Sequence, residues 1–156
     1  MSTLNISNLA RMSRESLAAL LASPAASKLA IVDVRDSGTA TTPMIKYPPS
    51  LTILDHIGGH IKSSIWVPSS ELDVKTPELI RTLKDKDKVV FHCALSQQRG
   101  PSAALRYTRE RHRLLGVDES KAQEVYVLDG GFSMWQAKYG DDEKLTEGYV
   151  KDIWMD

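Results

Sequence analysis

Short apolar runs alternate with amphipathic segments along most of this chain. Four runs, at residues 29–34, 65–67, 89–91 and 124–128, are rich in valine, isoleucine and leucine. Runs of this kind are typical of buried strands, and the run at 29–34 predicts a strand of a parallel sheet.

Helices are predicted between these runs. Ser13 indicates the first helix, because serine is a preferred N-cap and leucines follow it at helical spacing. The Thr-Pro-Glu sequence at 76–78 indicates another helix start, with Thr76 as the N-cap, proline at the first helical position and an acid in the first turn. Further helices are expected at about 100–113 and, after a Gly-Gly turn, at 132–139.

Alternating strands and helices predict an α/β fold with a central, mostly parallel sheet flanked by helices. We expect residues 1–156 to form a single domain. Residues of about 37–54 carry three prolines and few charges, which indicates an inserted surface loop. The tail at 140–156 contains Tyr149, Ile153 and Trp154 and is expected to pack back on the domain.

Composition narrows the possible functions of this 156-residue chain. Lys+Arg and Asp+Glu are both 20, so the net charge of zero gives no general attraction to nucleic acid or to an anionic membrane. No signal-peptide pattern and no run of about 18 apolar residues are present, which predicts a soluble intracellular protein. The single cysteine excludes an internal disulfide and a multi-cysteine metal site. We therefore expect a cytoplasmic protein, which could also enter the nucleus, with no metal, cofactor, nucleic-acid or membrane partner.

The candidate chemistry lies between the apolar run at 89–91 and the helix predicted at 100–113. Cys93 begins this connection and Arg99 ends it. A loop between a strand and a helix aims backbone N–H groups at an anion, and the same donors favour a thiolate over a thiol. An arginine can direct two hydrogen bonds onto a tetrahedral oxyanion. We expect Cys93 to be the nucleophile, and the following loop residues to bind the substrate: Ala94, Leu95, Ser96, Gln97, Gln98 and Arg99.

Four segments, in order along the chain, together resemble the rhodanese-like domains. They are Asp-Val-Arg at 33–35, Gly-His-Ile at 59–61, the loop that begins at Cys93, and Leu-Asp-Gly-Gly-Phe-Ser-Met-Trp at 128–135. Each motif alone is weak, but the ordered set is specific. The resemblance implies a rhodanese-like α/β domain.

The loop length points to one branch of this family. Five residues separate Cys93 from Arg99, one more than in the sulfurtransferases of the family. This length, and the flanking His-Cys and Arg-Gly-Pro, resemble the M-phase inducer phosphatases and the eukaryotic arsenate reductases of the small, single-domain type. The resemblance implies a phosphatase that hydrolyses phosphotyrosine or phosphoprotein monoesters through a phosphocysteine, with Arg99 stabilising the transition state.

Three other functions remain open at this point. An arsenate reductase would use Cys93 in the same way, and, with no second cysteine, would need glutathione and glutaredoxin as external partners. Thiosulfate sulfurtransfer is disfavoured by the loop length. A non-catalytic binding module is disfavoured because it has less need for an intact Cys93 and Arg99. The physiological substrate, which could be a phosphorylated protein or a small oxyanion, is not fixed by the sequence.

Three supporting residues complete the predicted site. His92 is expected to fix the loop through a hydrogen bond. Asp33 and Arg35 carry side chains of the kinds that acid catalysis and substrate contact require. The resemblance instead favours a buried aspartate in a structural ion pair. His60 is likewise expected to support the fold.

Two further features bear on the substrate. The loop has no carboxylic acid, since Ala94, Gln97 and Gln98 stand where the cell-cycle phosphatases carry acids, so the proton for a leaving group must come from elsewhere. Arginines at 106, 109 and 113 share one side of a predicted helix. They indicate a solvated face more than a docking surface for a phosphorylated protein.

Overall fold

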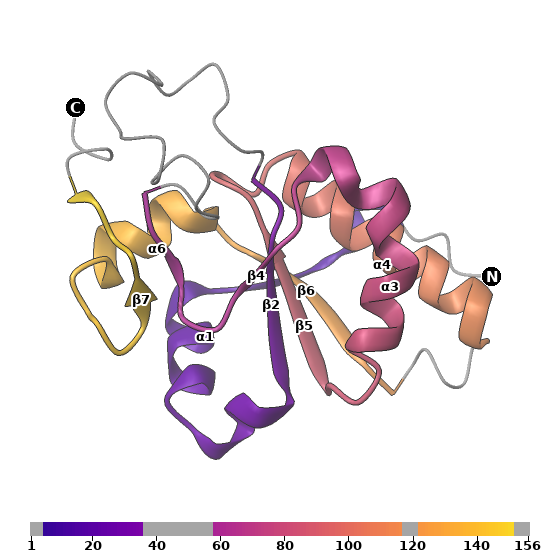
Figure 1. Cartoon of the computed structure of the whole chain (residues 1–156), viewed down its shortest axis with the longest axis horizontal. Coiled ribbons are helices and arrows are strands. Elements are labelled where there is room, and N and C mark those ends of the chain that lie inside the picture. The colour runs from indigo at the N-terminus through magenta and orange to yellow at the C-terminus, as the bar shows by residue number, and fades with distance from the viewer. Residues whose placement is uncertain (1–4, 36–57, 117–121, 152–156) are drawn as a thin grey trace.

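A five-stranded parallel sheet forms the centre of the molecule in the computed structural model, which describes residues 5–35, 58–116 and 122–151 (Figure 1). The strand order is β1-β6-β5-β2-β4, and every neighbouring pair is parallel. The strands of this sheet are β1 (Ala10–Met12), β2 (Leu29–Asp33), β4 (Ile65–Trp66), β5 (Lys88–His92) and β6 (Glu124–Leu128). The short strands β3 (His60–Ile61) and β7 (Thr146–Glu147) pair antiparallel beside it.

Helices cover both faces of the sheet (Figure 1). On one face lie α1 (Arg14–Leu21) and α6 (Gly131–Tyr139), and on the other lie α3 (Leu72–Thr82) and α4 (Arg99–Leu115). Short 3₁₀ turns precede β1, β2 and α3, as η1 (Ile6–Asn8), η2 (Pro24–Lys28) and η4 (Ser69–Glu71).

Successive side chains of the central strand β5 point to opposite faces of the sheet. Val89 and Phe91 of β5 join the core beneath α3 and α4, whereas Val90 joins the core beneath α1 and α6. Because β5 alternates in this way and both faces are covered, its apolar residues are continuous rather than alternating with polar ones. The α/β class and the central parallel sheet flanked by helices are therefore confirmed.

The predicted start of one helix was wrong. Helix α3 begins at Leu72, so Thr76 lies inside it, where its Oγ1 donates to the carbonyl oxygen of Leu72 at 2.6 Å. Pro77 follows within the helix and withholds one backbone donor. Leu72 is buried in the core under α3, and this burial extends the helix beyond the point where the Thr-Pro-Glu sequence favours a start. In contrast, Ser13 caps α1 as predicted, accepting from the Ser16 N–H at 3.1 Å.

Strand β1 was not predicted from the hydrophobic pattern. It has three residues, of which only Met12 is buried, so it lacks the apolar run that marks the other strands. It pairs with β6 in a register that places Arg11 opposite Val127. This edge position puts Arg11 beside the carboxyl ends of the central strands.

The whole predicted insertion at about 37–54 lies outside the described residues, as do Ile153 and Trp154 of the predicted tail. In the described part of the tail, the Tyr149 hydroxyl donates to the Gln136 side chain at 2.5 Å, and β7 pairs with β3. Among the described residues, no helix is both long and apolar enough to cross a membrane.

Candidate active site

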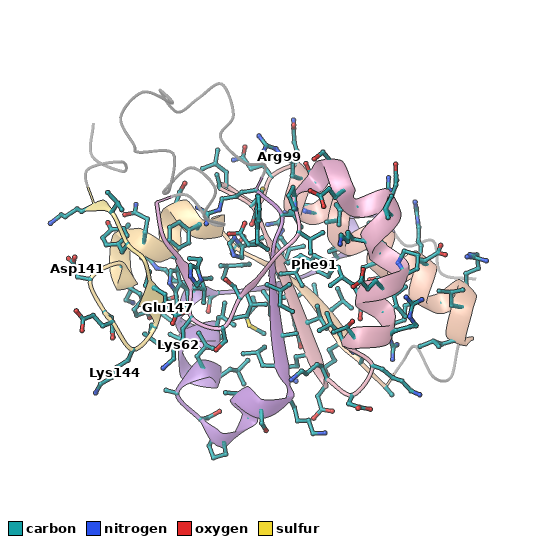
Figure 2. All side chains as sticks on the ribbon, in the orientation of Figure 1. Lys62, Phe91, Arg99, Asp141, Lys144 and Glu147 are labelled. Carbon is teal, nitrogen blue, oxygen red and sulfur yellow. The ribbon has the colours of Figure 1, made fainter. Side chains whose placement is uncertain are left out.

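The candidate site lies where the central strands end and helix α4 begins. Cys93 directly follows β5, and Arg99 is the first residue of α4. In Figure 2, Phe91 lies within the sheet, whereas Arg99 lies beyond the end of β5. Ligand sites of open α/β sheets form at this edge, because strand ends and helix N-termini meet there.

The sulfur of Cys93 is held by two backbone donors. The N–H of Ser96 lies 3.2 Å from Sγ and the N–H of Gly100 lies 3.3 Å from it. The Gln98 side chain makes no capping hydrogen bond within the described part of the chain, so the first turn of α4 keeps donors for the loop. These donors and the positive end of a 17-residue helix stabilise negative charge on the sulfur.

Ser96 gives the loop its inward turn. Its backbone adopts a φ of 56°, in the left-handed region that non-glycine residues seldom occupy. The side chain is fully buried, and its hydroxyl has no hydrogen-bond partner among the described residues. Strained residues of this kind collect at functional sites, where the surrounding structure holds them in place.

Two glycines allow the loop to pack closely. A Cβ on Gly100 would lie 3.2 Å from the Cys93 nitrogen, and a Cβ on Gly131 would lie 2.5 Å from the carbonyl oxygens of both Cys93 and Ala94. Next to Gly131, the N–H of Phe132 donates to Cys93 O at 3.0 Å and that of Ser133 donates to Ala94 O at 2.9 Å. The start of α6 therefore holds the loop from the side opposite α4.

The remaining loop residues lie at its rim. Leu95, Gln97, Gln98 and Arg99 are exposed, and Ala94 is half-buried. The structure thus brings Cys93, Ser96 and Gly100 together, with the Arg99 side chain exposed at the end of the same loop. The sequence placed Gly100 at a helix start and Gly131 in a motif, but it did not predict that these glycines or Arg11 contact the Cys93 loop.

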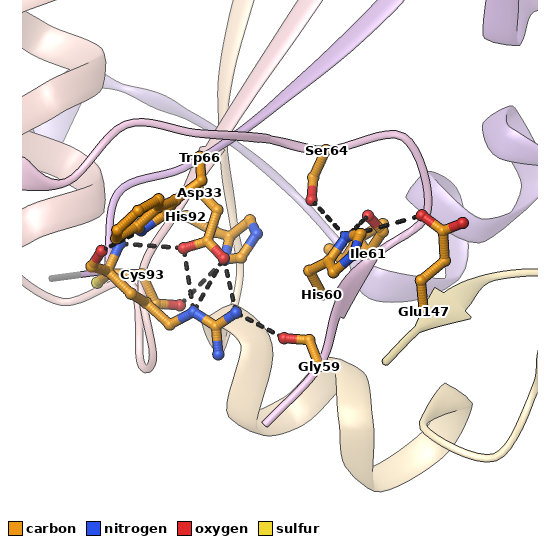
Figure 3. Close-up of polar contacts among 10 residues, drawn as sticks. Asp33, Gly59, His60, Ile61, Ser64, Trp66, His92, Cys93 and Glu147 are labelled. Carbon is orange, nitrogen blue, oxygen red and sulfur yellow. Dashed lines mark hydrogen bonds and ion pairs between the residues drawn. The ribbon is translucent and has the colours of Figure 1, made fainter. Parts of the chain in front are cut away.

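His92 lies fully buried beneath the loop, near Asp33 (Figure 3). Its Nδ1 lies 3.2 Å from the carbonyl oxygen of Cys93, which fits a neutral ring that donates from this nitrogen. Burial lowers the pKa of His92 below its ordinary value of 6.5; the Asp33 charge opposes this shift and the Arg35 charge adds to it. Its Nε2 has no hydrogen-bond partner among the described residues.

The buried ring makes the stability of the protein depend on pH. Below pH 6.5 the unfolded chain gains a proton on this histidine that the folded chain does not, so the free energy of unfolding falls as pH falls. Replacing His92 with glutamine should therefore make the free energy of unfolding depend less steeply on pH between about pH 7 and pH 5. The slope should fall by up to about 1.4 kcal/mol per pH unit. Urea unfolding across this range measures the effect, with the exposed His112→Gln as the control. The same pH dependence of the free energy of unfolding in wild type and His92→Gln would contradict this role of His92.

Asp33 and Arg35 form a buried ion pair at the base of the site (Figure 3). Arg35 Nη2 donates to Asp33 Oδ2 at 2.6 Å, and its Nε lies 2.9 Å from the same oxygen. The guanidinium also donates to Gly59 O at 2.7 Å and lies over the Phe132 ring at 4.5 Å. With its carboxylate fully buried and paired, Asp33 fits the structural role better than a role in acid catalysis.

His60 and two of the helix arginines contact partners outside the Cys93 loop. His60 Nδ1 lies near Ile61 O, at 3.1 Å, and the Ser64 hydroxyl, at 3.3 Å (Figure 3).

On α4, Arg106 pairs with Asp73 and Arg113 pairs with Glu110 at the surface. Their neighbour Arg111 is instead buried. Among the described residues, no group of three metal-ligating side chains could hold a metal ion.

Several known proteins are similar to this chain in sequence or in fold. The chain is 44% identical over 111 residues to the CDC25-like phosphatase YCH1 of Saccharomyces cerevisiae, covering 64% of this chain and 72% of that protein. It is 36% identical over 109 residues to arsenate reductase 2.1 of Oryza sativa subsp. japonica, covering 70% of this chain and 57% of the relative. Among solved structures it resembles Ygr203w, a yeast protein tyrosine phosphatase of the rhodanese family, with a TM-score of 0.68 and 33% identity over 98% of this chain and 100% of the other.

The family assignment rests on most of the chain. The rhodanese-like domain matches residues 13–138, from the cap of α1 to the last turn of α6. This range contains the Cys93 loop, the Asp33–Arg35 pair and Gly131. The chain therefore belongs to the rhodanese-like domain family and is related to its CDC25-like phosphatases and arsenate reductases.

Proposed function

We propose that this protein is a cysteine-dependent phosphatase that hydrolyses phosphotyrosine and other phosphoprotein monoesters. The observation that carries the proposal is the position of Cys93 Sγ, which accepts hydrogen bonds from two backbone N–H groups at the N-terminus of α4. The same donors that stabilise a thiolate can receive the oxygens of a phosphoryl group. The similarity to YCH1, named as a CDC25-like phosphatase, supports this reaction class.

In the first step the Cys93 thiolate attacks phosphorus. An S–P bond forms as the ester P–O bond breaks, and the leaving oxygen takes a proton. Arg99 would bind two of the three equatorial oxygens, and the loop N–H groups would bind the rest. The rate gain comes from positioning and from fixed donors that match the charge of the transition state.

In the second step water attacks the phosphocysteine. The S–P bond breaks, orthophosphate leaves, and the electron pair returns to the sulfur. The N–H groups of Ser96 and Gly100, which point at the sulfur, would then stabilise the departing thiolate. The cycle requires a reduced cysteine, which the cytoplasm or nucleus maintains.

The loop supplies no carboxylic acid to protonate the leaving group, since Ala94, Gln97 and Gln98 are neutral. An aryl oxide leaves without full protonation, whereas an alkoxide does not. We therefore expect kcat/KM for an aryl phosphate to exceed that for an alkyl phosphate of similar size by roughly 10² or more, the usual contribution of a general acid. Steady-state kinetics with a matched pair of substrates tests this, and equal values would show that an acid from another part of the protein is at work.

Arsenate reduction is the second candidate, favoured by the likeness to the rice arsenate reductase and by the neutral loop. Cys93 would attack arsenic and release water. Glutathione would then attack the Cys93 sulfur, and arsenite would leave with the two electrons of the S–As bond. Glutaredoxin would reduce the resulting mixed disulfide. An external thiol is required because the chain has no second cysteine.

Parallel assays of one preparation separate the two functions. Phosphate release from an aryl phosphate and glutathione-dependent arsenite formation with glutaredoxin are measured on the wild-type protein. The proposal predicts a higher kcat/KM for the aryl phosphate. Arsenite formation without phosphate release would transfer the assignment to the reductase.

A further inference from the structure

Three carbonyl groups of the Cys93 loop accept hydrogen bonds from neighbouring elements. The Cys93 and Ala94 carbonyls accept from the backbone of α6, as described above. The third, Ser96 O, accepts from the Arg11 side chain, whose Nη1 lies 3.4 Å away. This is a long hydrogen bond, but it is charge-assisted, and Arg11 is the only side chain among these three donors.

The direction of one carbonyl fixes the direction of the next N–H. In a trans peptide the C=O of one residue and the N–H of the following residue point in opposite directions. Because Ser96 O is turned toward Arg11, the N–H of Gln97 points away from Arg11. The N–H of Ser96 itself points at Cys93 Sγ. Consecutive N–H groups arranged around a residue with positive φ form an anion-binding concavity, and Ser96 has that φ.

Arg11 also neutralises a carboxylate near the loop. The same Nη1 lies 3.2 Å from Asp129 Oδ1, and the Arg11 and Asp129 side chains keep 40% and 64% of their exposure. Asp129 is tied to β1 by its N–H, which donates to Met12 O at 2.9 Å. Without Arg11, an unpaired carboxylate would remain at this edge and repel an anionic substrate.

We propose that Arg11 is a positioning residue for oxyanion binding, which acts by holding the Ser96 carbonyl away from the Cys93 loop's anion-binding side. The inference rests on the proposed function, because it assigns Arg11 to the same anion site. Arg11 does not contact the reacting atoms. It sets the orientation of the Ser96–Gln97 peptide, and with it the affinity of the loop for phosphate or arsenate.

The test compares Arg11→Gln with Arg14→Gln. Arg14 lies three positions further along the chain and also donates to a backbone carbonyl, but its partners are Met134 O at 2.7 Å and Glu15 at 3.0 Å, outside the loop. The two variants lose the same charge. Because Cys93 is the only cysteine, alkylation of the protein reports on this site alone. Its protection by increasing inorganic phosphate gives the dissociation constant without turnover.

Arg11→Gln should raise the phosphate dissociation constant about tenfold, the effect of losing one hydrogen bond to a charged group. KM for an aryl phosphate should rise in parallel, with a smaller change in kcat. Arg14→Gln should change each value by less than about twofold. An unchanged phosphate affinity in folded Arg11→Gln would overturn the role of Arg11. A wild-type protein that phosphate does not protect would overturn the proposed function, and with it this inference.

A double variant separates loop orientation from charge. In Arg11→Gln/Asp129→Asn, the carboxylate that Arg11 neutralised is removed as well. If Arg11 acts through the Ser96 carbonyl, phosphate affinity stays weak in the double variant. Full recovery of wild-type affinity would show that charge repulsion alone was responsible, and would contradict the positioning role.

Discussion

Replacing Cys93 with serine is expected to lower kcat/KM for an aryl phosphate by a factor on the order of 10⁴ or more, as the loss of a catalytic nucleophile does in other enzymes. A serine hydroxyl does not ionise at neutral pH, so the N–H groups of Ser96 and Gly100 would have no thiolate to stabilise. Initial rates at substrate concentrations well below KM measure this loss.

The fold and the anion site should survive the same substitution. The two donors are backbone groups, so Cys93→Ser keeps them, and the free energy of unfolding should change by no more than about 1 kcal/mol. Inorganic phosphate should still raise the unfolding temperature of the variant. Substantial activity in a folded Cys93→Ser protein would remove the sulfur from the mechanism.

Replacing Gly131 with alanine is expected to lower the free energy of unfolding by about 3 kcal/mol or more. The new Cβ would lie 2.5 Å from two carbonyl oxygens of the Cys93 loop, and the backbone φ of 60° is unfavourable for alanine. Since the obstructing atoms are backbone, relief requires the loop and α6 to move apart. Urea unfolding measures the loss, and kcat/KM should fall with it because the Phe132 and Ser133 hydrogen bonds to the loop lengthen.

Gly148 provides a matched control. Its φ of 63° is nearly the same, but in the described part of the chain no atom lies within 4 Å of the position that a Cβ would take. Gly148→Ala should therefore cost about 1 kcal/mol, from backbone strain alone, and leave kcat/KM unchanged. Equal losses for the two variants would mean that Gly131 does not hold the loop by close packing.

Several features of the fold could be predicted because their signal is local. The strands at 29–34 and 124–128 are recognisable from continuous apolar residues, and the structure places β2 and β6 there. Ser13 marks the start of α1 by cap chemistry that involves only its near neighbours. The connection from Cys93 to Arg99 is visible in the same way, since strand, loop and helix are consecutive in the sequence.

Other features depend on contacts between distant residues. Strand β1 has a single buried residue, Met12, and is defined by pairing with β6 near the other end of the chain. The start of α3 depends on burial of Leu72, which outweighs the cap chemistry at Thr76. In both cases tertiary packing decided what the local pattern could not.

The same distinction applies to the site. The Cys93 loop is local, but its contact with Arg11 joins residues that are 85 positions apart. Gly131 belongs to a motif that the sequence identified, yet its closeness to the Cys93 and Ala94 carbonyls follows only from the folded chain. Gly100 was seen as part of the helix start, and its N–H proved to point at the sulfur.

The central claim is that Cys93 carries the phosphoryl group during turnover. Rapid acid quenching of wild-type protein with an aryl phosphate, followed by peptide mass spectrometry, tests it most directly. We predict one phosphoryl group on the peptide that contains Cys93, formed as fast as the aryl product is released and absent from Cys93→Ser. Steady phosphate release without this adduct, or with a phosphoryl group on another residue, would contradict the account.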